Sequence, residues 1–478
     1  MRLALVYTPT FAEENWSAIR AQERNIGLIT PLSLAYVAAV AEKAGHQVII
    51  IDAVADRLSI DGVMERLEEF SPDILGFTMT TYMFHQALSW IKELKERTGL
   101  PVLIGGQHLG TYPLETMTHK EIDYAIVGEA EITLPNFLET WGNGRSLRKV
   151  NGLIFREKGK VIFNPPQDKF MAIDEIPFPS RHLLDNSKYY NVVSRRKNFT
   201  PMITTRGCPF RCIFCDLKKT QWRMRTPKNV VDEMEECCRN FDIKEIDFYD
   251  SSFTFDKQRV LAICEEIRRR KLDVAWSVRT RVDCIDKEIL RALSKSGCVR
   301  LMYGIESADE GILKILRKGI KIERIRKVIK WTKEYRLEAL GFFIIGSPGE
   351  TKETAMATIR LAQELPLDWV QFAKMTPFPS TELYQMLMED TGEDYWRKFV
   401  LNPANEKPLP LVRTQMTPQE AQKLIRQAYL GFFLKPQKVI SSLGRMRSLA
   451  DFRKSFEAFL DMLFLSPITS DSAISSSL

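Results

Sequence analysis

Cysteine is scarce in this sequence, and the places where it is missing are informative. The chain has 8 cysteines among 478 residues, and none of them precedes Cys208. This is too few for the disulfide framework of a small secreted protein. Three of the eight crowd into residues 208–215. In a long chain of ordinary composition, such crowding indicates a metal site more often than a disulfide bridge.

Long apolar runs and a strong charge bias are also absent. No 18 consecutive residues are apolar, so the sequence predicts no membrane-spanning helix, and the apolar run 2–8 is too short for a signal sequence. We therefore expect a cytoplasmic protein, in which free thiols persist. The net charge of +7 arises from 68 basic and 61 acidic residues. This mild excess does not by itself indicate nucleic acid, and the basic runs 195–197 and 268–271 are expected to be solvated faces.

Residues 1–140 alternate between short apolar runs and helical patterns. Because the apolar runs are continuous, they predict a parallel sheet with helices on both faces, a Rossmann-like doubly wound α/β fold. The predicted strands are 2–7, 47–51, 73–78, 101–105 and 123–127, and the predicted helices are 32–43, 62–70, 84–97 and 134–141. Ligands of such sheets bind outside the carboxyl ends of the strands. No GxGxxG follows the first strand, which argues against a dinucleotide.

A second alternating series begins at Pro201, after a predicted hairpin at 152–164 and a proline-rich linker at 165–199. Its predicted strands are 202–205, 245–249, 274–278, 299–303, 339–345 and 369–375, and its predicted helices are 229–240, 257–269, 287–296, 322–335 and 351–365. Six strand–helix units in one direction predict a full or partial (β/α) barrel, with active residues at the carboxyl ends of the strands.

The sequence therefore divides into four predicted parts. They are a Rossmann-like domain over 1–145, a hairpin and linker over 146–199, a barrel over 200–385 and a helical C-terminal domain over 386–478. The last part ends in a serine-rich tail that we expect to be disordered. Its apolar runs 424–435 and 456–465 have helical periodicity, so we expect them to pack against the mouth of the barrel. Contact with a lipid-like substrate or a membrane surface is the alternative.

Cys208, Cys212 and Cys215 follow a predicted strand with the spacing C-x3-C-x2-C. Three thiolates on one loop can bind three irons of a 4Fe–4S cluster, which normally takes four. No fourth cysteine follows at ligand spacing, so one iron stays open for an external ligand. A zinc site is less well supported, because no nearby histidine or cysteine completes a tetrahedron. Three unrelated thiols are the other alternative, and the remaining five cysteines are expected to be buried and inert.

This cysteine spacing, with an aromatic residue at Phe214, resembles the signature of the radical S-adenosylmethionine (SAM) superfamily. In that family the open iron binds the amino and carboxylate groups of SAM, and one electron cleaves SAM to a 5′-deoxyadenosyl radical. The resemblance covers roughly residues 200–385 and includes the segments IDFYDSSFT, WSVRTRVD, GCVRLMYGIES and GFFIIGSPGET. It implies that SAM is bound by Phe214, Asp250, Ser251, Arg281, Glu306, Ser307, Phe343 and Gly346.

Each of these residues also has a structural interpretation. Ser251 stands where the family usually has a second acidic residue, which weakens its assignment to SAM. Asp250 and Glu306 are alternatively surface carboxylates, although both end apolar strands, where solvation is partial. Arg281 alternatively pairs with Asp283.

The segments PLSLAYVAAVAEKAGHQVIIIDA, SPDILGFTMTT and VLIGGQHLGTYPLETMTHKEIDYAIVGEAE resemble the N-terminal domain of cobalamin-binding radical SAM enzymes. The D-x-H-x-x-G motif, whose histidine coordinates cobalt, is absent here, as in many members of this subfamily. The resemblance implies a corrin held by backbone donors and polar side chains at the strand ends. The expected cobalamin-binding residues are Thr78, Thr80, Thr81, Tyr82, Gly105, Gly106, Gln107, His108, Gly128 and Glu129. A domain that has lost cobalamin and only holds substrate is the alternative.

The resemblance implies a cobalamin-dependent radical SAM enzyme with a 4Fe–4S cluster, SAM and cobalamin as cofactors. The expected reaction abstracts hydrogen from an unactivated carbon of a small-molecule or lipid-like substrate and transfers a methyl group to it. Cyclisation, ring contraction or carbon–carbon bond formation on a lipid, terpenoid or tetrapyrrole is the alternative, and a redox protein with an inert cluster is another. An electron donor such as flavodoxin or ferredoxin is the expected partner. No nucleic acid is expected, because a methylthiolating RNA-modifying relative would need a second cysteine triplet, and none precedes Cys208.

Overall fold

The computed structural model describes residues 1–9, 27–217, 220–402 and 409–435. These residues divide into two compact units. The first unit contains residues 1–9, 30–189 and 394–402, and the second contains the rest of the described chain.

The first unit is built on a seven-stranded sheet with the strand order β3-β1-β4-β5-β6-β7-β8. Its strands are β1 (Arg2–Tyr7), β3 (Gln47–Asp52), β4 (Ile74–Thr78), β5 (Val102–Gly105), β6 (Tyr124–Ile126), β7 (Leu153–Glu157) and β8 (Lys160–Phe163). The first five strands in chain order are parallel, whereas β7 and β8 add an antiparallel hairpin. This is a doubly wound sheet, as predicted, and its strand order reverses where β1 lies between β3 and β4. That reversal point is where ligands of such sheets bind.

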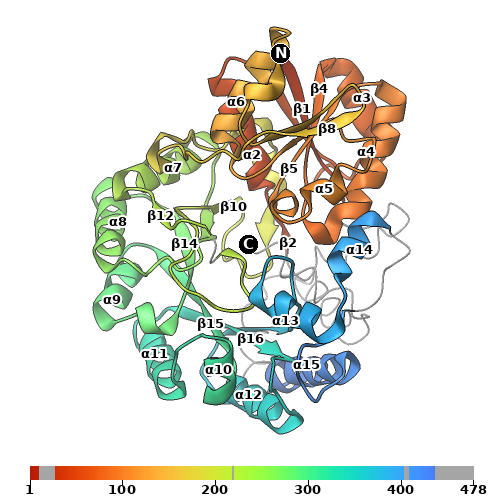
Figure 1. The fold of residues 1–478 in the computed structure, drawn as a ribbon. Coiled ribbons are helices and arrows are strands. Elements are labelled where there is room, and N and C mark those ends of the chain that lie inside the picture. Colours follow the sequence, from red (N-terminus) through yellow and green to blue (C-terminus); the bar gives the residue numbers. More distant parts are fainter. Residues whose placement is uncertain (10–26, 218–219, 403–408, 436–478) are drawn as a thin grey trace. The chain divides into compact units, whose positions relative to one another are not determined.

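Helices cover both faces of this sheet (Figure 1). On one face lie α2 (Leu32–Lys43) and α6 (Ala130–Gly142), and on the other lie α3 (Ile60–Phe70) and α4 (Phe84–Thr98). The short α5 (Pro113–Thr116) follows β5. The strands are apolar on both faces because each face packs against helices. The proline-rich segment after β8 also packs on this unit, since the Ser180 amide donates to the carbonyl of Ala35 in α2.

A late segment of the chain also belongs to the first unit. Helix α14 (Tyr395–Leu401) is held beside α5 by the ion pair of Arg397 with Glu115, at 2.6 Å. Tyr112 donates to the Asp394 carboxylate at 2.9 Å. A carbonyl near the end of α14 is also satisfied, because His119 donates to the Val400 carbonyl at 3.0 Å.

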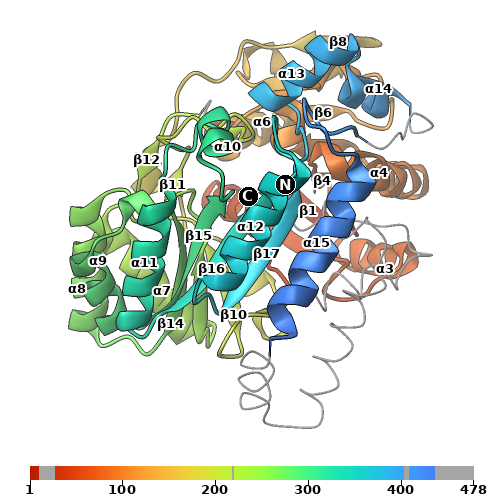
Figure 2. The same cartoon turned by 90° about the horizontal axis from the view of Figure 1, so that it is seen from below.

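The second unit is built on a six-stranded parallel sheet with the order β10-β13-β14-β15-β16-β17. Its strands are β10 (Phe199–Met202), β13 (Glu245–Phe248), β14 (Ala275–Thr280), β15 (Cys298–Glu306), β16 (Glu338–Ile345) and β17 (Trp369–Lys374). The helices α7 (Pro227–Asn240), α8 (Lys257–Arg270), α9 (Lys287–Lys295), α11 (Ile322–Glu334), α12 (Lys352–Glu364) and α15 (Pro418–Phe433) lie on its outer side (Figure 2). Since β10 and β17 form the two edges of this sheet, the barrel is partial rather than closed.

Smaller elements connect the strands of the second unit. The helices α10 (Glu310–Ile315) and α13 (Glu382–Thr391) follow β15 and β17. Two short antiparallel ladders pair β2 (Gly27–Leu28) with β9 (Tyr190–Asn191) and β11 (Thr205–Arg206) with β12 (Arg223–Met224). None of the described helices is long and apolar enough to cross a membrane.

Alternate residues of the barrel strands have different environments. In β14, Trp276 and Val278 belong to the apolar core beneath the helices, whereas Ser277 and Arg279 point to the other face. On that inner face Asp247 accepts from Ser277 at 2.9 Å and pairs with Arg279 at 3.3 Å. The face of the sheet that packs against the helices is therefore apolar, and the inner face of the partial barrel carries charged side chains.

Two predicted strands of this unit have other bounds in the structure. The first strand was expected at 202–205 but spans Phe199–Met202, because a proline is tolerated on an edge strand, where its missing N–H needs no partner. The fourth was expected at 299–303 but continues to Glu306, past a register shift between Gly304 and Glu306.

The apolar run 424–435 packs on the barrel, but against the outer side of its sheet rather than at the expected mouth. Leu424, Ala428 and Phe432 of α15 are buried in the same core as the strands and the outer helices. Tyr429 donates to the Phe372 carbonyl of β17 at 3.2 Å. The other apolar run, 456–465, and the serine-rich tail lie outside the described residues.

Truncating a leucine of α15 tests this packing. Leu424 is 4% exposed and Leu434, just beyond the helix, is 56% exposed. We expect Leu424→Ala to lower the free energy of unfolding by about 2–5 kcal/mol, because it leaves a cavity in the core. The matched Leu434→Ala variant should change it by less than about 0.5 kcal/mol. Urea denaturation followed by circular dichroism measures both, and equal effects would contradict the packing of α15.

Candidate functional site

The cysteine loop begins at a fixed point at the carboxyl ends of the barrel strands. Asp250, just after β13, accepts hydrogen bonds from the Thr204 and Thr205 amides at 2.7 and 3.0 Å and from the Thr204 hydroxyl. Arg259 of α8 donates to the same hydroxyl at 2.7 Å. These bonds lock the turn from β10 into β11, and Cys208 follows two residues after β11 ends.

Glycine is required at the entry to the loop. Gly207 has a φ of +76°, and an added Cβ would lie 2.7 Å from the Gln221 carbonyl oxygen, so a side chain meets both strain and a backbone clash. Ser251 donates to the Gly207 carbonyl at 2.8 Å. The sequence assigned Ser251 to SAM binding, and in the structure its hydroxyl supports the loop.

The middle of the loop is held by two neighbouring helices. The Ile213 amide donates to the Leu316 carbonyl at the end of α10 at 3.3 Å, and the Ile213 carbonyl accepts from the Leu383 amide in α13 at 3.0 Å. Of the three cysteines, Cys212 is buried, whereas Cys208 and Cys215 are half-buried. Cys208 and Cys215 are thus less deeply buried than Cys212.

Two cations lie beside the buried cysteine. Arg281, after β14, has its Nη1 4.0 Å from the Cys212 sulfur, and its guanidinium lies over the Phe210 ring at 3.9 Å from the centroid. Arg281 pairs with Asp283 at 2.8 Å and donates to the Lys318 carbonyl. The ammonium of Lys318 pairs in turn with Glu306 at 2.7 Å. Lys318 therefore links Arg281 to Glu306 at this site, through its carbonyl and its ammonium group.

These residues explain the protonation of the cysteines. Burial raises the pKa of the Cys212 thiol, and the charges of Lys318 and Arg281 oppose that rise. Burial raises the pKa of Cys215 to about 12. Both thiols therefore stay protonated at neutral pH unless a metal displaces the proton.

The donor set of the loop suits a cluster. Within residues 1–9, 27–217, 220–402 and 409–435, no group of three His, Cys, Asp or Glu side chains is placed to hold a metal ion. The loop offers three cysteine sulfurs, and in a 4Fe–4S cluster each cysteine binds a different iron.

Several predicted SAM-binding side chains have internal partners instead. Both oxygens of Asp250 are engaged by the β10–β11 turn, which leaves them in a supporting position. Ser307 is fully buried and contacts Thr358 at 3.3 Å. Phe343 points to the helix side of the sheet and stacks on Phe372, with 5.0 Å between centroids. The alternation of β16 directs its neighbour Phe342 to the inner face.

Two further predicted positions lie nearer the expected site. Phe214 is half-buried inside the cysteine loop. Gly346 follows β16 with a φ of +95°, and its amide donates to the Glu350 carboxylate at 2.5 Å. This bond fixes the turn after β16, where the adenine of SAM is expected.

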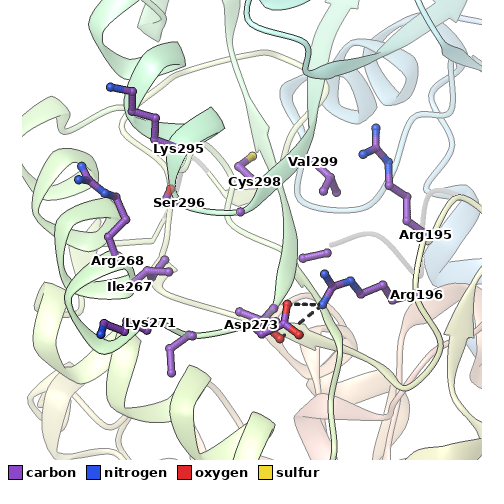
Figure 3. A pocket seen from close by; sticks show the side chains of 14 residues that line it. Arg195, Arg196, Ile267, Arg268, Lys271, Asp273, Lys295, Ser296, Cys298 and Val299 are labelled. Atoms are coloured by element: carbon purple, nitrogen blue, oxygen red, sulfur yellow. Dashed lines mark hydrogen bonds and ion pairs between the residues drawn. The ribbon is translucent and has the colours of Figure 1, made fainter.

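A cavity of about 630 Å³ lies at the opposite end of the barrel strands (Figure 3). It is lined by five basic side chains and one acidic one: Arg195, Arg196, Arg268, Lys271, Lys295 and Asp273. Arg196 pairs with Asp273 at 2.8 Å. Arg268 and Lys295 occupy the last turns of α8 and α9, where cations complement the helix dipole. The positive charge of this cavity is therefore explained by helix ends and an ion pair, without a ligand. The cavity is also separate from the cysteine loop.

The predicted cobalamin rim lies at the carboxyl ends of β4, β5 and β6 in the first unit. At Gly105 and Gly128 an added Cβ would meet no atom of the described residues within 4 Å, so within that part of the chain the backbone there is uncrowded. Gly106 and Gln107 are exposed beside them, and Glu129 is the N-cap residue of α6. Uncrowded backbone donors suit the amide side chains and the phosphate of a corrin.

The threonines of this rim are divided between two roles. Thr78 is half-buried at the end of β4, and the hydroxyl oxygen of Thr80 is buried without a hydrogen-bond partner, as is expected beside a ligand. Thr81 contacts Nδ1 of His108 at 2.9 Å and belongs to the interior. Tyr82 is half-buried in the short turn that carries Thr81.

His108 lies in the core rather than on the rim. Its second ring nitrogen, Nε2, contacts the Thr116 hydroxyl at 2.7 Å. Burial, with His119 and His85 nearby, lowers the pKa of His108 to about 3. Both ring nitrogens of His108 therefore have partners in the interior of the first unit. The prediction of His108 as a rim residue is therefore corrected, because the turn after Gly106 folds the ring inward.

The other histidines do not supply a cobalt ligand either. The chain has 5 histidines, and all five lie in the first unit. His85 and His119 hydrogen-bond to α14 carbonyls. His46 lies by the chain's first residue, at the other end of the sheet, and His182 contacts Glu42 of α2 at 2.9 Å. None of them reaches the rim.

Sequence reasoning missed the residues that support the cysteine loop. Lys318 carries no motif and lies between α10 and α11, in a segment with several other basic residues. Leu316 and Leu383 act through backbone atoms, which leave no signal in the side-chain pattern. Gly304, two residues before Glu306, was the available clue, since an added Cβ there would lie 2.6 Å from both Glu306 and Lys318.

Comparison with known proteins agrees with both units. The model of the radical SAM superfamily matches residues 202–362, and that of the B12 binding domain matches residues 27–138. The uncharacterized methyltransferase PH0819 of Pyrococcus horikoshii is 34% identical over 93% of this chain and 95% of its own length. An anaerobic magnesium-protoporphyrin IX monomethyl ester cyclase of Rubrivivax gelatinosus is 31% identical over 75% of this chain and 66% of its own.

A solved structure shares the fold. The cobalamin-dependent S-adenosylmethionine radical enzyme OxsB aligns with a TM-score of 0.71 and 18% identity, over 95% of this chain and 70% of OxsB. With the cysteine loop, the partial barrel and the doubly wound sheet in place, the relationship is plain. The chain belongs to the cobalamin-binding radical SAM enzymes.

Proposed function

We propose that this enzyme transfers a methyl group to an unactivated carbon of a small-molecule substrate. The observation that carries the proposal is the cysteine loop, whose three sulfurs suit three irons of a cluster and leave the fourth iron for SAM. The relative matched over nearly its whole length is named as an uncharacterized methyltransferase, and another relative is named as a cytidylyl-2-hydroxyethylphosphonate methyltransferase; both names favour methyl transfer. The substrate itself is chosen by pocket shape rather than by these motifs.

The residues of the second unit hold and shield the reacting groups. Cys208, Cys212 and Cys215 bind the cluster, and the Ile213 backbone bonds keep their loop in place. When bound, the cluster supplies the electron that cleaves SAM, and cobalamin supplies the methyl group. The inner face of the barrel, with Arg279 and Asp247, offers polar contacts to the substrate. This arrangement orients reactants, which is the main contribution of a protein to cofactor chemistry.

The residues of the first unit hold the corrin. The backbone at Gly105, Gly106 and Gly128 and the side chains of Gln107 and Thr80 face it. A flavodoxin or ferredoxin donates the electron. Non-methylating chemistry is the second candidate, because one relative is named as a cyclase that acts on a tetrapyrrole ester.

Labelled SAM separates these outcomes. The chain is reconstituted anaerobically with iron, sulfide and cobalamin, reduced, and given methyl-labelled SAM together with a small-molecule extract. We expect 5′-deoxyadenosine together with label in an extracted compound. Deoxyadenosine with no labelled product would support the cyclase-type alternative, and the absence of deoxyadenosine would overturn radical chemistry altogether.

Substituting one cysteine tests the cluster site. We expect Cys212→Ala to lose most bound iron and all SAM cleavage, because two thiolates hold a cluster poorly. Cys238→Ala is the matched control, since Cys238 is half-buried on α7, outside the cysteine loop. Iron and sulfide content after reconstitution measures both. Equal iron content in the two variants would refute the assignment of the triplet.

The histidine geometry predicts the state of the bound cobalamin. We expect the electron paramagnetic resonance (EPR) spectrum of its cobalt(II) form to lack nitrogen splitting from a protein ligand. The physical reason is that all five histidines have partners away from the rim. Splitting that disappears in His108→Gln, and not in His182→Gln, would contradict this expectation.

A further inference from the structure

Two ion pairs lie end to end beside Cys212. Arg281 pairs with Asp283 at 2.8 Å, and Lys318 pairs with Glu306 at 2.7 Å. The pairs are joined because Arg281 donates to the Lys318 carbonyl. The Arg281 guanidinium is also fixed over the Phe210 ring within the cysteine loop. The charges near this sulfur are therefore rigidly placed.

A cation of these pairs lies beside the sulfur. Arg281 Nη1 is 4.0 Å from the Cys212 sulfur, and Arg281 also donates to the Lys318 carbonyl. The cysteine loop is held to the same connection, because the Ile213 amide donates to the Leu316 carbonyl, two residues before Lys318. The Lys318–Glu306 pair is therefore tied to the residues around this sulfur, and its electric field acts there.

Burial keeps this field strong. The side chains of Lys318 and Glu306 are 7% and 8% exposed. Charges in such surroundings interact far more strongly than charges in water, and salt screens them little. Burial lowers the pKa of Lys318 and the Glu306 carboxylate raises it, with a net rise, so the ammonium remains charged at neutral pH.

The fold maintains this pair at a cost. Glu306 has a φ of +68°, a left-handed conformation that is unfavourable for a residue with a Cβ. Gly304 leaves the room that the two side chains fill, since a Cβ there would lie 2.6 Å from each of them. A buried ion pair seldom adds stability over apolar residues of the same size. Its strained placement beside a cluster ligand therefore indicates a role in function.

We propose that the Lys318–Glu306 pair is a positioning pair that sets the reduction potential of the cluster through Cys212. This inference rests on the proposed function, because it requires a 4Fe–4S cluster on the cysteine loop. The reduced flavodoxin or ferredoxin gives one electron and is oxidised, and the cluster gains one negative charge. Lys318 stabilises that added charge and Glu306 opposes it. Net charge and nearby dipoles are known to tune such potentials.

Substitutions of the two partners should shift the potential in opposite directions. We expect Lys318→Met to lower the midpoint potential, because the cation is lost and the Glu306 carboxylate remains. We expect Glu306→Gln to raise it, because the opposing charge is lost and the shape is kept. A merely structural role would not give shifts of opposite sign. Lys321→Met is the matched control, since Lys321 is exposed on the same connection and solvent screens its charge.

The measurement is a redox titration of the full chain, reconstituted with cluster and cobalamin and followed by the EPR signal of the reduced cluster. Iron content is measured first. If Lys318→Met fails to bind iron, the direction of the Glu306→Gln shift decides. Unchanged potentials, or shifts of the same sign in both variants, would overturn this inference alone. A wild-type chain that binds no cluster would overturn the proposed function with it.

Discussion

The buried carboxylate of Asp250 is the constraint on which the cysteine loop depends. It receives two backbone amides and one hydroxyl from Thr204 and Thr205. Burial raises the pKa of Asp250, whereas Arg259 and these hydrogen bonds lower it. A carboxylate inside a protein is tolerable only when it is paired in this way. The pairing fixes the end of β10, and with it the direction in which the cysteine loop leaves the sheet.

The same principle of paired charges extends through the barrel interior. Arg225 donates to the carbonyl of Ile203, the residue before Thr204, at 3.0 Å. It also pairs with Glu233. On the inner face, Arg300 pairs with Glu338 at 2.6 Å. The outer face of the same strands is apolar and packs under helices. Apolar packing under the helices therefore stabilises the sheet from its outer face. The inner face and the strand ends can then carry charged and polar side chains that are available for catalysis.

The first unit uses its polar groups differently. Its rim is formed by glycines and uncrowded backbone groups, while its histidines are directed inward or toward α14. A corrin offers many amide groups, and an edge of backbone donors can meet them without a metal ligand from the protein. The second unit thus offers mainly side chains to its ligands, whereas the first unit offers mainly backbone groups.

Much of this could be predicted from the sequence because the signals are local. Continuous apolar strands between amphipathic helices determined the doubly wound sheet and the parallel barrel strands. The spacing of Cys208, Cys212 and Cys215 predicted a 4Fe–4S cluster, since a loop this short keeps its three thiols in one part of the fold. Local patterns did not determine bounds such as those of β10, where the edge position of Pro201 overrides its usual effect.

Only the tertiary structure decided which residues surround the cluster ligands. Lys318 reaches Glu306, and Arg281 reaches Cys212, because the parallel strands bring their carboxyl ends to one edge. His108 turned inward for a related reason, since its partners Thr81 and Thr116 come from two other turns of the chain. The sequence by itself determined the ligand types and their spacing. The charges around them and the side chains that face the ligands depend on distant contacts, which no local pattern encodes.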